Sequence, residues 1–290
     1  MYSQISANKR KTVYIMLLFL IVIGAIGYGY SLYFNDTSSL YYIFGFAIFY
    51  TLISYFASSK VAISLNGAKE IQKKDNPRLY RIVENISITT GLPMPRVYII
   101  EDSAPNAFAT GRNPEHSHVA ATTGLLSILT DTELEGVIAH EFGHIQNYDI
   151  RVMMIVFACV SIIGLLSDMF IRMMWFGGDN ENRSPIGSLV GIAVAILAPI
   201  VALLVQLAVS RRREFLADAT GALTTRYPEG LASALQKLEQ SGTTLKRQNT
   251  STAHFFISNP LKSKSFSKLF STHPPMQERV EKLKQMGSNL

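Results

Sequence analysis

The stretch VYIMLLFLIVIGAIGYGYSLYF, residues 13–34, decides what kind of fold this chain can adopt. It contains no charged side chain, and at a rise of about 1.5 Å per residue it is as long as the hydrocarbon core of a bilayer. A second uncharged stretch follows at 40–57, and Asp36 is the only charged residue between Lys11 and Lys60. The two stretches predict a membrane hairpin.

Two further apolar stretches, at 152–170 and 186–209, predict a second hairpin. The averages of the whole chain conceal this pattern, because 48% hydrophobic and 17% charged residues would also suit a water-soluble domain. A soluble fold cannot enclose four such segments of about 20 residues each. The single cysteine, Cys159, lies inside the third segment, which excludes a disulfide scaffold. We therefore expect a mainly α membrane protein with about four transmembrane helices.

The basic residues predict the orientation of these helices. The formal net charge is +6, and Lys and Arg residues gather at the ends of the apolar stretches, at 9–11, 60–74, 151 and 211–213. If these flanks are cytoplasmic, only Arg172 and Arg183 lie outside, which is the positive-inside pattern. The N-terminus is then cytoplasmic. No nucleic-acid-binding module accompanies the charge, so we expect the bilayer and not a nucleic acid as the partner.

The hairpins divide the chain into four parts. These are an N-terminal hairpin (1–57), a first water-facing part (58–151), a second hairpin (152–209) and a second water-facing part (210–290). Because both water-facing parts are expected on the same side, we predict that they form one α+β domain, split by the second hairpin.

Local signals place secondary structure in the water-facing parts. Asn76-Pro77 is typical of a helix start and Gly91 of a helix end, and Thr130-Asp-Thr-Glu133 is a capping box for a helix that runs to about Asn147. Strands are expected at 96–100, 106–110 and 119–123, and further helices near 214–223, 229–240 and 275–286. The polar stretch 241–272 is expected to be a mobile loop.

The capped helix carries His140-Glu141-Phe-Gly-His144. Residues four apart lie on one face of a helix, so both imidazoles can bind one metal ion. Glu141, one step round the helix, can then act as general base and acid on the attacking water. The alternative is an ordinary histidine pair on an amphipathic helix. The spacing favours a zinc site.

A catalytic zinc usually has three protein ligands, so a third ligand is needed. A histidine six residues beyond His144 is excluded, because that position is Ile150. Glu214 is the candidate, with Asp218 one turn later to accept the free N–H of a ligand histidine. Alternatively, Glu214 only neutralises the arginines before it. The missing third ligand favours the metal-binding interpretation.

Four motifs, in this order, resemble the HtpX-type membrane zinc metalloproteases, relatives of the CAAX prenyl-protease. They are Asn106-Ala-Phe-Ala-Thr-Gly111, His140-Glu-Phe-Gly-His144, Arg213-Glu-Phe-Leu-Ala-Asp218 and Thr272-His-Pro-Pro275 followed by Arg279. The resemblance implies a zincin-like protease domain with one Zn²⁺, facing the cytoplasm from a bacterial plasma membrane. It also implies that the enzyme cleaves misfolded or damaged membrane proteins as part of quality control in the stress response.

The resemblance assigns further residues to the site. It implies His273 as a donor to the oxyanion and Arg279 as a charge behind the metal ligands. It also implies an edge strand that binds substrate by strand addition, formed by Asn106, Ala107, Phe108, Ala109 and Thr110.

Two other classes of function compete with the protease hypothesis. A membrane adaptor or holdase could use zinc only to hold its domain together, but structural sites normally have four protein ligands, often cysteines, and Cys159 lies in an apolar stretch. A transporter would need paired polar groups near the bilayer centre, and the apolar stretches carry almost none. Within the enzymes, a prenyl-specific protease would need more helices than four spans supply.

Overall fold

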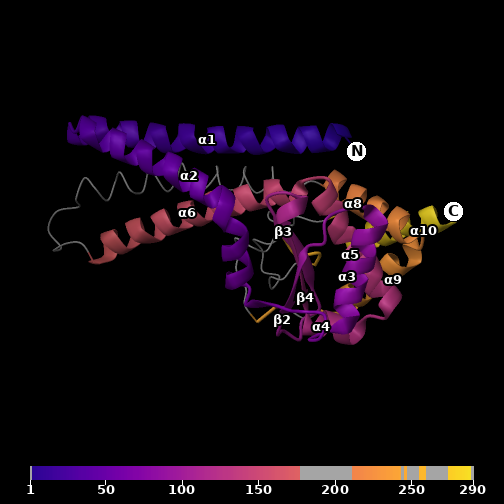
Figure 1. The fold of residues 1–290 in the computed structure, drawn as a ribbon. Helices are drawn as coiled ribbons and strands as arrows, with labels where there is room; N and C mark the ends of the chain where they lie inside the picture. Colours follow the sequence, from indigo (N-terminus) through magenta and orange to yellow (C-terminus); the bar gives the residue numbers. More distant parts are fainter. Residues whose placement is uncertain (1, 177–210, 243–244, 247–254, 259–273, 289–290) are drawn as a thin grey trace.

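The computed structural model describes residues 2–176, 211–242, 245–246, 255–258 and 274–288 (Figure 1). The predicted fourth apolar helix at 186–209 and the candidate oxyanion donor His273 lie outside these residues.

Three long helices extend away from the rest of the molecule (Figure 1): α1 (Tyr2–Phe34), α2 (Thr37–Leu65) and α6 (Asp149–Phe176). Only two residues separate α1 from α2. The second of them, Asp36, caps α2 by accepting a hydrogen bond from the Ser38 N–H. All three helices are longer than the apolar stretches that predict them. α1 begins 11 residues before Val13 and α2 continues 8 residues beyond Ala57, so the sequence stretches mark the apolar cores of the helices and not their ends.

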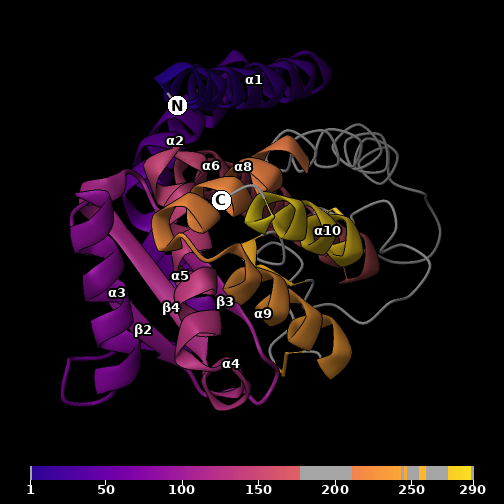
Figure 2. The ribbon, with the colours of Figure 1, turned by 90° about the vertical axis from the view of Figure 1, so that its right-hand side faces the viewer.

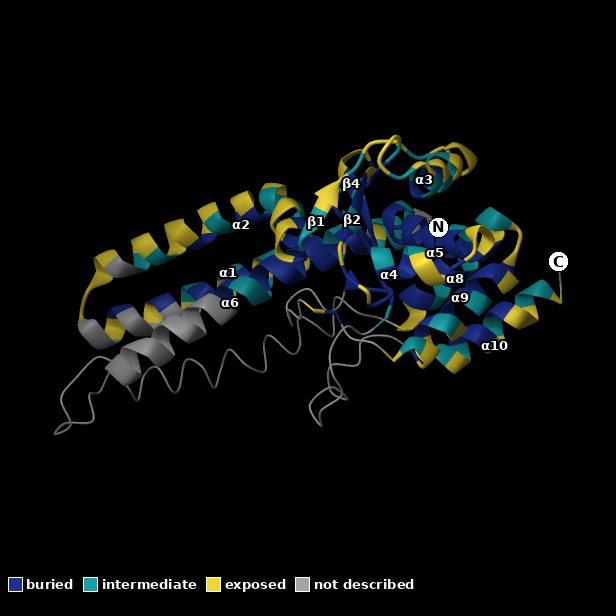
Figure 3. Ribbon diagram, turned by 90° about the horizontal axis from the view of Figure 1, so that it is seen from below, coloured by how far each residue is buried: buried dark blue, intermediate teal, exposed yellow. Residues whose placement is uncertain are grey.

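Large apolar side chains point outward along α1 and α2, and Figure 3 shows α2 as a largely exposed helix. Examples are Leu17, Ile21, Tyr41, Phe49 and Phe56. Among the described residues, Leu40–Leu65 is the one helix that alone is long and apolar enough to cross a membrane. The inner faces of α1, α2 and α6 share an apolar cluster. An exposed apolar surface of this extent marks a site of contact with a membrane or with another protein.

The sheet has the strand order β1-β2-β4-β3. β1 (Ala68–Glu70) is antiparallel to β2 (Arg96–Ile100), β2 is parallel to β4 (Ser117–Thr122), and β4 is antiparallel to β3 (Ala107–Gly111). The turn η1 (Pro114–His116) joins β3 to β4. The three predicted strands are confirmed within two residues, whereas β1 was not predicted. β3 lies at one edge of this sheet.

Helix α5 (Asp131–Gln146) is the centre of the part of the molecule that contains the sheet. It packs against α3 (Pro77–Thr90), α8 (Arg211–Thr225), α9 (Pro228–Ser241) and β3 (Figure 2). The short α4 (Thr123–Ile128) precedes it, and α10 (Met276–Gly287) packs on α9. The predicted capping box is present. The Thr130 side chain accepts a hydrogen bond from the Glu133 N–H, and the Glu133 side chain accepts one from the Thr130 N–H. Asn76 and Gly91 bound α3 as predicted.

The connection between α9 and α10 returns to the sheet. Leu245, Phe255, Phe256 and Ile257 are all at most 5% exposed. The phenylalanines pack on Phe108 of β3. The expectation of a mobile loop over 241–272 is therefore wrong for these residues, because their apolar side chains belong to the core.

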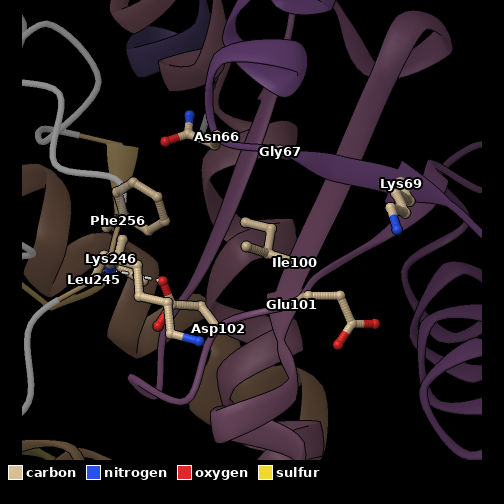
Figure 4. Close-up of a pocket in the computed structure, with 9 residues that line it drawn as sticks. All are labelled: Asn66, Gly67, Lys69, Ile100, Glu101, Asp102, Leu245, Lys246 and Phe256. Atoms are coloured by element: carbon tan, nitrogen blue, oxygen red, sulfur yellow. Dashed lines mark hydrogen bonds between the residues drawn. The ribbon is translucent and has the colours of Figure 1, made fainter.

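A pocket of about 320 Å³ lies where this connection meets β1 and β2 (Figure 4). The Lys246 N–H donates to Asp102 Oδ2 at 2.7 Å and so ties the connection to the end of β2. Phe256 lines the same pocket, and none of the candidate site residues that the structure describes does. The pocket is thus separate from the predicted metal site.

Candidate metal centre

The two histidines of α5 face each other as their spacing predicts. His140 and His144 are 1% and 6% exposed, and their Nε2 atoms are 3.2 Å apart. Glu214 enters from the first turn of α8. Its Oε2 lies 3.8 Å from His140 Nε2 and its Oε1 lies 3.6 Å from His144 Nε2. Three potential ligands from two helices therefore meet at one point.

Close packing of α5 on α8 makes this meeting possible. A Cβ atom at Gly221 would lie 2.9 Å from the His140 backbone nitrogen, and one at Gly143 would lie 3.0 Å from Ala217 Cα. Real Cβ atoms essentially never approach backbone atoms at 2.9 Å. Glycine at these two positions lets the helix backbones touch, which brings Glu214 within reach of both histidines.

The distances between the three ligand atoms fit a zinc ion. Tetrahedral bonds of about 2.0–2.1 Å place ligand atoms about 3.3 Å apart. Here the two Nε2 atoms are 3.2 Å apart, and the Glu214 oxygens Oε1 and Oε2 lie 3.6 Å from His144 Nε2 and 3.8 Å from His140 Nε2. Among the described residues, these three side chains form a group that could hold a metal ion. Three protein ligands leave a coordination position for water or substrate, as in catalytic sites.

The partners of the imidazoles fix which nitrogen is free. His140 Nδ1 lies 2.9 Å from Asp218 Oδ1, and His144 Nδ1 lies 3.1 Å from Asp149 Oδ2. Each carboxylate accepts a hydrogen bond from Nδ1, so Nε2 is the ring nitrogen that faces the other histidine and Glu214. Two ring nitrogens and a carboxylate that converge on one point in this way favour a bound cation.

The charges around the site lead to the same conclusion. Four carboxylates are buried here, those of Glu141, Asp149, Glu214 and Asp218, together with two guanidinium groups, those of Arg213 and Arg279. Buried charge is stable only when it is compensated, and a divalent cation would balance this excess of carboxylates.

The two histidines have opposite pKa shifts. Burial lowers the pKa of His140 to about 4, so its Nε2 is unprotonated at neutral pH. Burial also acts on His144, but hydrogen bonding to Asp149 and the charge of Glu214 outweigh it and raise its pKa to about 9. Without a metal ion the carboxylates therefore draw a proton to His144. Metal binding would displace that proton.

Glu141 is buried beside the ligands. Burial raises its pKa to about 7, and the charge of Glu214 acts in the same direction, against the nearby His144. The backbone N–H of Ala109 in β3 hydrogen bonds to the Glu141 side chain. A carboxyl group with a pKa near neutrality can both accept and return a proton, which is the property of a general base and acid.

Arg279 lies behind His140 and is fully buried. Its Nε and Nη2 donate to Asp218 at 2.8 and 2.6 Å, and this ion pair lowers the pKa of Asp218 in spite of burial. Its Nη1 lies 3.6 Å from Glu214 Oε2. Arg279 thus holds the carboxylate that orients His140 and lies near the third ligand, in the place that the resemblance implies.

Sequence reasoning missed Asp149. This residue is 1% exposed and is the partner of His144, as Asp218 is of His140. The chain turns sharply at Tyr148, where φ is 60°, so the first residue of α6 comes back to the last turn of α5. The bend between the two helices is 77°. An Asp three residues after the end of a helix that carries two ligand histidines was the available signal.

The edge of β3 is partly covered. The Ile257 N–H donates to the Ala107 carbonyl at 3.1 Å, and Asn106 exchanges hydrogen bonds with the backbone of Ser258. The outward N–H of Ala109 is directed to Glu141. The candidate substrate strand therefore runs beside the metal cluster, with its N-terminal end covered by the α9–α10 connection.

Comparison with known proteins identifies the family to which the chain is similar. The model of peptidase family M48 matches residues 73–287. The chain is 54% identical to "Protease HtpX homolog" of Tropheryma whipplei over 289 residues, which cover 99% of both chains. It is 44% identical to "Protease HtpX homolog" of Streptococcus gordonii over 296 residues, 99% of this chain and 100% of that one.

The fold also has a relative among solved structures. The crystal structure of S. mikatae Ste24p superposes on 98% of this chain and 67% of that chain, with a TM-score of 0.52 and 19% sequence identity. At this identity the likeness concerns the fold. Since the family model spans most of the chain and full-length protease relatives share about half of its residues, the chain belongs to peptidase family M48 and is a membrane metalloprotease.

Proposed function

We propose that the chain is a zinc-dependent endopeptidase that hydrolyses peptide bonds of misfolded or damaged membrane proteins at the cytoplasmic face of a bacterial plasma membrane. The observation that carries the proposal is the convergence of His140, His144 and Glu214 next to the buried Glu141. His140, His144 and Glu214 would hold a zinc ion, and the chemistry that it would supply there is Lewis acidity toward a peptide carbonyl and toward water, whose pKa would fall to about 7.

Glu141 moves the proton in this reaction. It takes a proton from the attacking water as a bond forms between the water oxygen and the peptide carbon, and it gives a proton to the leaving amine as the C–N bond breaks. The hydrogen bond from the Ala109 N–H keeps the carboxylate directed along β3. His273 is the proposed hydrogen-bond donor to the oxyanion, and Arg279 is the proposed charge behind the metal ligands; both proposals are supported by the motif that resembles the HtpX-type proteases.

Substrate binds by adding a strand to the edge of β3. The edge positions near Ala109 are beside Glu141, whereas Ala107 and Asn106 are bonded to the α9–α10 connection. A substrate strand would therefore pair with the part of β3 that follows the Ala109 N–H, because that N–H is already bonded to Glu141. Strand addition needs an extended, unfolded segment, which supports damaged proteins as substrates.

The competing adaptor hypothesis also predicts zinc binding but no cleavage. Three ligands with an adjacent buried general base support the protease, because a site that only stabilises a domain has no use for an open coordination position.

Removal of the metal tests the proposed function. The full-length protein, purified in detergent, is incubated with unfolded casein after treatment with a chelator. Cleavage should fall to background and return on addition of one equivalent of Zn²⁺ but not of Mg²⁺, because imidazole ligands suit zinc and oxygen ligands suit magnesium. The measurement is the rate of peptide release. Zinc binding without cleavage would favour the adaptor, and full cleavage by the metal-free protein would exclude a metal-dependent mechanism.

The proposed topology has four transmembrane spans, with the turns of both hairpins on the outer side of the membrane. Because Cys159 is the only cysteine, a Cys159→Ser background allows single-cysteine labelling. Asp179→Cys should react with a membrane-impermeant maleimide added to intact cells, because it lies between the third and fourth apolar stretches. Lys69→Cys should react only after the cells are lysed. Labelling of both positions in intact cells, or of neither, would contradict the topology.

A further inference from the structure

The first turns of α1 lie on the metal centre. Asn8 is 5% exposed, and its Nδ2 donates to Asp149 Oδ1 at 2.8 Å. The other oxygen of the same carboxylate, Oδ2, lies 3.1 Å from His144 Nδ1. A continuous path of two hydrogen bonds thus joins the N-terminal helix to a candidate metal ligand.

Asp149 depends on this contact for its orientation. It is 1% exposed, and a buried carboxylate oxygen that loses its hydrogen-bond donor has a free-energy cost that favours another orientation of the side chain. Oδ2 is bonded to His144, while Oδ1 has Asn8 at hydrogen-bond distance and Arg213 Nη1 at 3.7 Å. Arg213 also hydrogen bonds to Asp149. The Asn8 amide and Arg213 therefore together hold the Asp149 carboxylate, and the amide is the neutral donor that lies 2.8 Å from Oδ1.

Asn8 also fixes the junction between α5 and α6. The same Nδ2 donates to the carbonyl of Asn147 at 2.8 Å, which is one of the carbonyls left without an intrahelical partner at the end of α5. Lys9 lies over the ring of Tyr148, 4.6 Å from its centroid. Asn8 itself is positioned on α1, where its carbonyl accepts a hydrogen bond from Thr12.

We propose that Asn8 is a positioning residue for His144, so that the metal centre reaches its full affinity only when the N-terminal membrane helix is docked on the α5–α6 junction. Partners that orient a ligand imidazole through its second nitrogen typically change metal affinity by about 10–100-fold. Asn8 acts one step further out, through Asp149. This inference rests on the proposed function of His144 as a zinc ligand.

The zinc affinity of the full-length protein in detergent tests the proposal, by competition with a chromophoric chelator. Asn8→Asp has the same shape but replaces the donor with a carboxylate that faces Asp149, and it should weaken zinc binding by about 10-fold or more. Thr51→Val removes a buried hydrogen bond of the same kind from the neighbouring helix α2, where the Thr51 hydroxyl donates to the Ala47 carbonyl, and it should leave the affinity unchanged. Thermal unfolding of the metal-free proteins checks that both variants are folded. If Asn8→Asp does not fold, Asn8→Ala takes its place.

The double variant Asn8→Asp/Asp149→Asn provides the decisive comparison. It exchanges the two groups, so that a carboxylate at position 8 faces an amide at position 149. The amide oxygen at position 149 can still accept a hydrogen bond from His144 Nδ1. Its loss of zinc affinity should be smaller than the product of the two single losses. Independent effects, or an Asn8→Asp protein with wild-type affinity, would overturn the proposal. Wild-type protein that binds no zinc would overturn the proposed function and this inference together.

Discussion

Glu141→Gln should lower the rate of peptide cleavage by roughly 10²- to 10⁴-fold and leave zinc content at one ion per chain. General acid–base catalysis by a positioned side chain typically contributes this factor. Glutamine has the shape of glutamate and can still accept the hydrogen bond from the Ala109 N–H, but it cannot take a proton from water. Since Glu141 is not one of the three ligands, the metal should stay bound. The rate constant kcat and the zinc content of the same sample are the measurements.

Glu133→Gln is the matched control on the same helix. Glu133 is also buried, but hydrogen bonds from Lys237, Ser233 and Thr130 outweigh burial and lower its pKa to about 2. A lowered pKa means that the ionised form stabilises the fold above the ordinary pKa of glutamate, and that this contribution is lost as the pH falls toward 2. At neutral pH the control should therefore unfold at lower temperature, while kcat of the folded protein is unchanged. An active Glu141→Gln enzyme would exclude Glu141 as the general base.

The part of this fold that local chemistry determines could be predicted from the sequence. Asn76, Gly91 and Thr130 bound helices because caps act within one turn, and His140 and His144 share a face because they are four apart. Glu214 could be predicted as a partner because a metal site with two histidines needs a third ligand. The helix caps and the histidine pair require no knowledge of how distant segments pack, whereas Glu214 also required the expectation that the second hairpin returns the chain to the histidines.

The remainder depends on docking between distant segments, which leaves no local pattern. Asn8 and Asp149 are 141 positions apart, and Asn8 reads in the sequence as a polar residue before a basic cluster. β1 has only three residues, too few for an alternating pattern. Phe255 and Phe256 lie among polar residues, so composition favours a loop, although both side chains are buried on Phe108. In each case a contact between distant segments determines the structure.

Glu214→Ala should remove most of the zinc affinity, by more than the roughly 10–100-fold typical of residues that only orient a ligand. The carboxylate contributes both a ligand atom and a negative charge at 3.6 and 3.8 Å from the two Nε2 atoms. Without it, two neutral imidazoles remain, and a zinc ion then lacks the charge and the third ligand of a catalytic site. The measurement is the zinc dissociation constant, together with the cleavage rate at saturating zinc.

Glu214→Asp separates the ligand from the charge. Aspartate keeps the negative charge beside Arg213 and near Arg279 Nη1, but its carboxylate is withdrawn by about 1.5 Å, the length of one C–C bond. If Glu214 only neutralised the neighbouring arginines, Glu214→Asp would bind zinc like the wild type and Glu214→Ala would mainly lower the stability of the metal-free protein. A ligand role predicts that both variants lose zinc affinity, because a bond of about 2.0–2.2 Å to the metal tolerates no such withdrawal. Arg213 forms an ion pair with Asp149 at 3.7 Å and so has a counter-charge besides Glu214. Aspartate can therefore replace Glu214 as a counter-charge but not as a metal ligand.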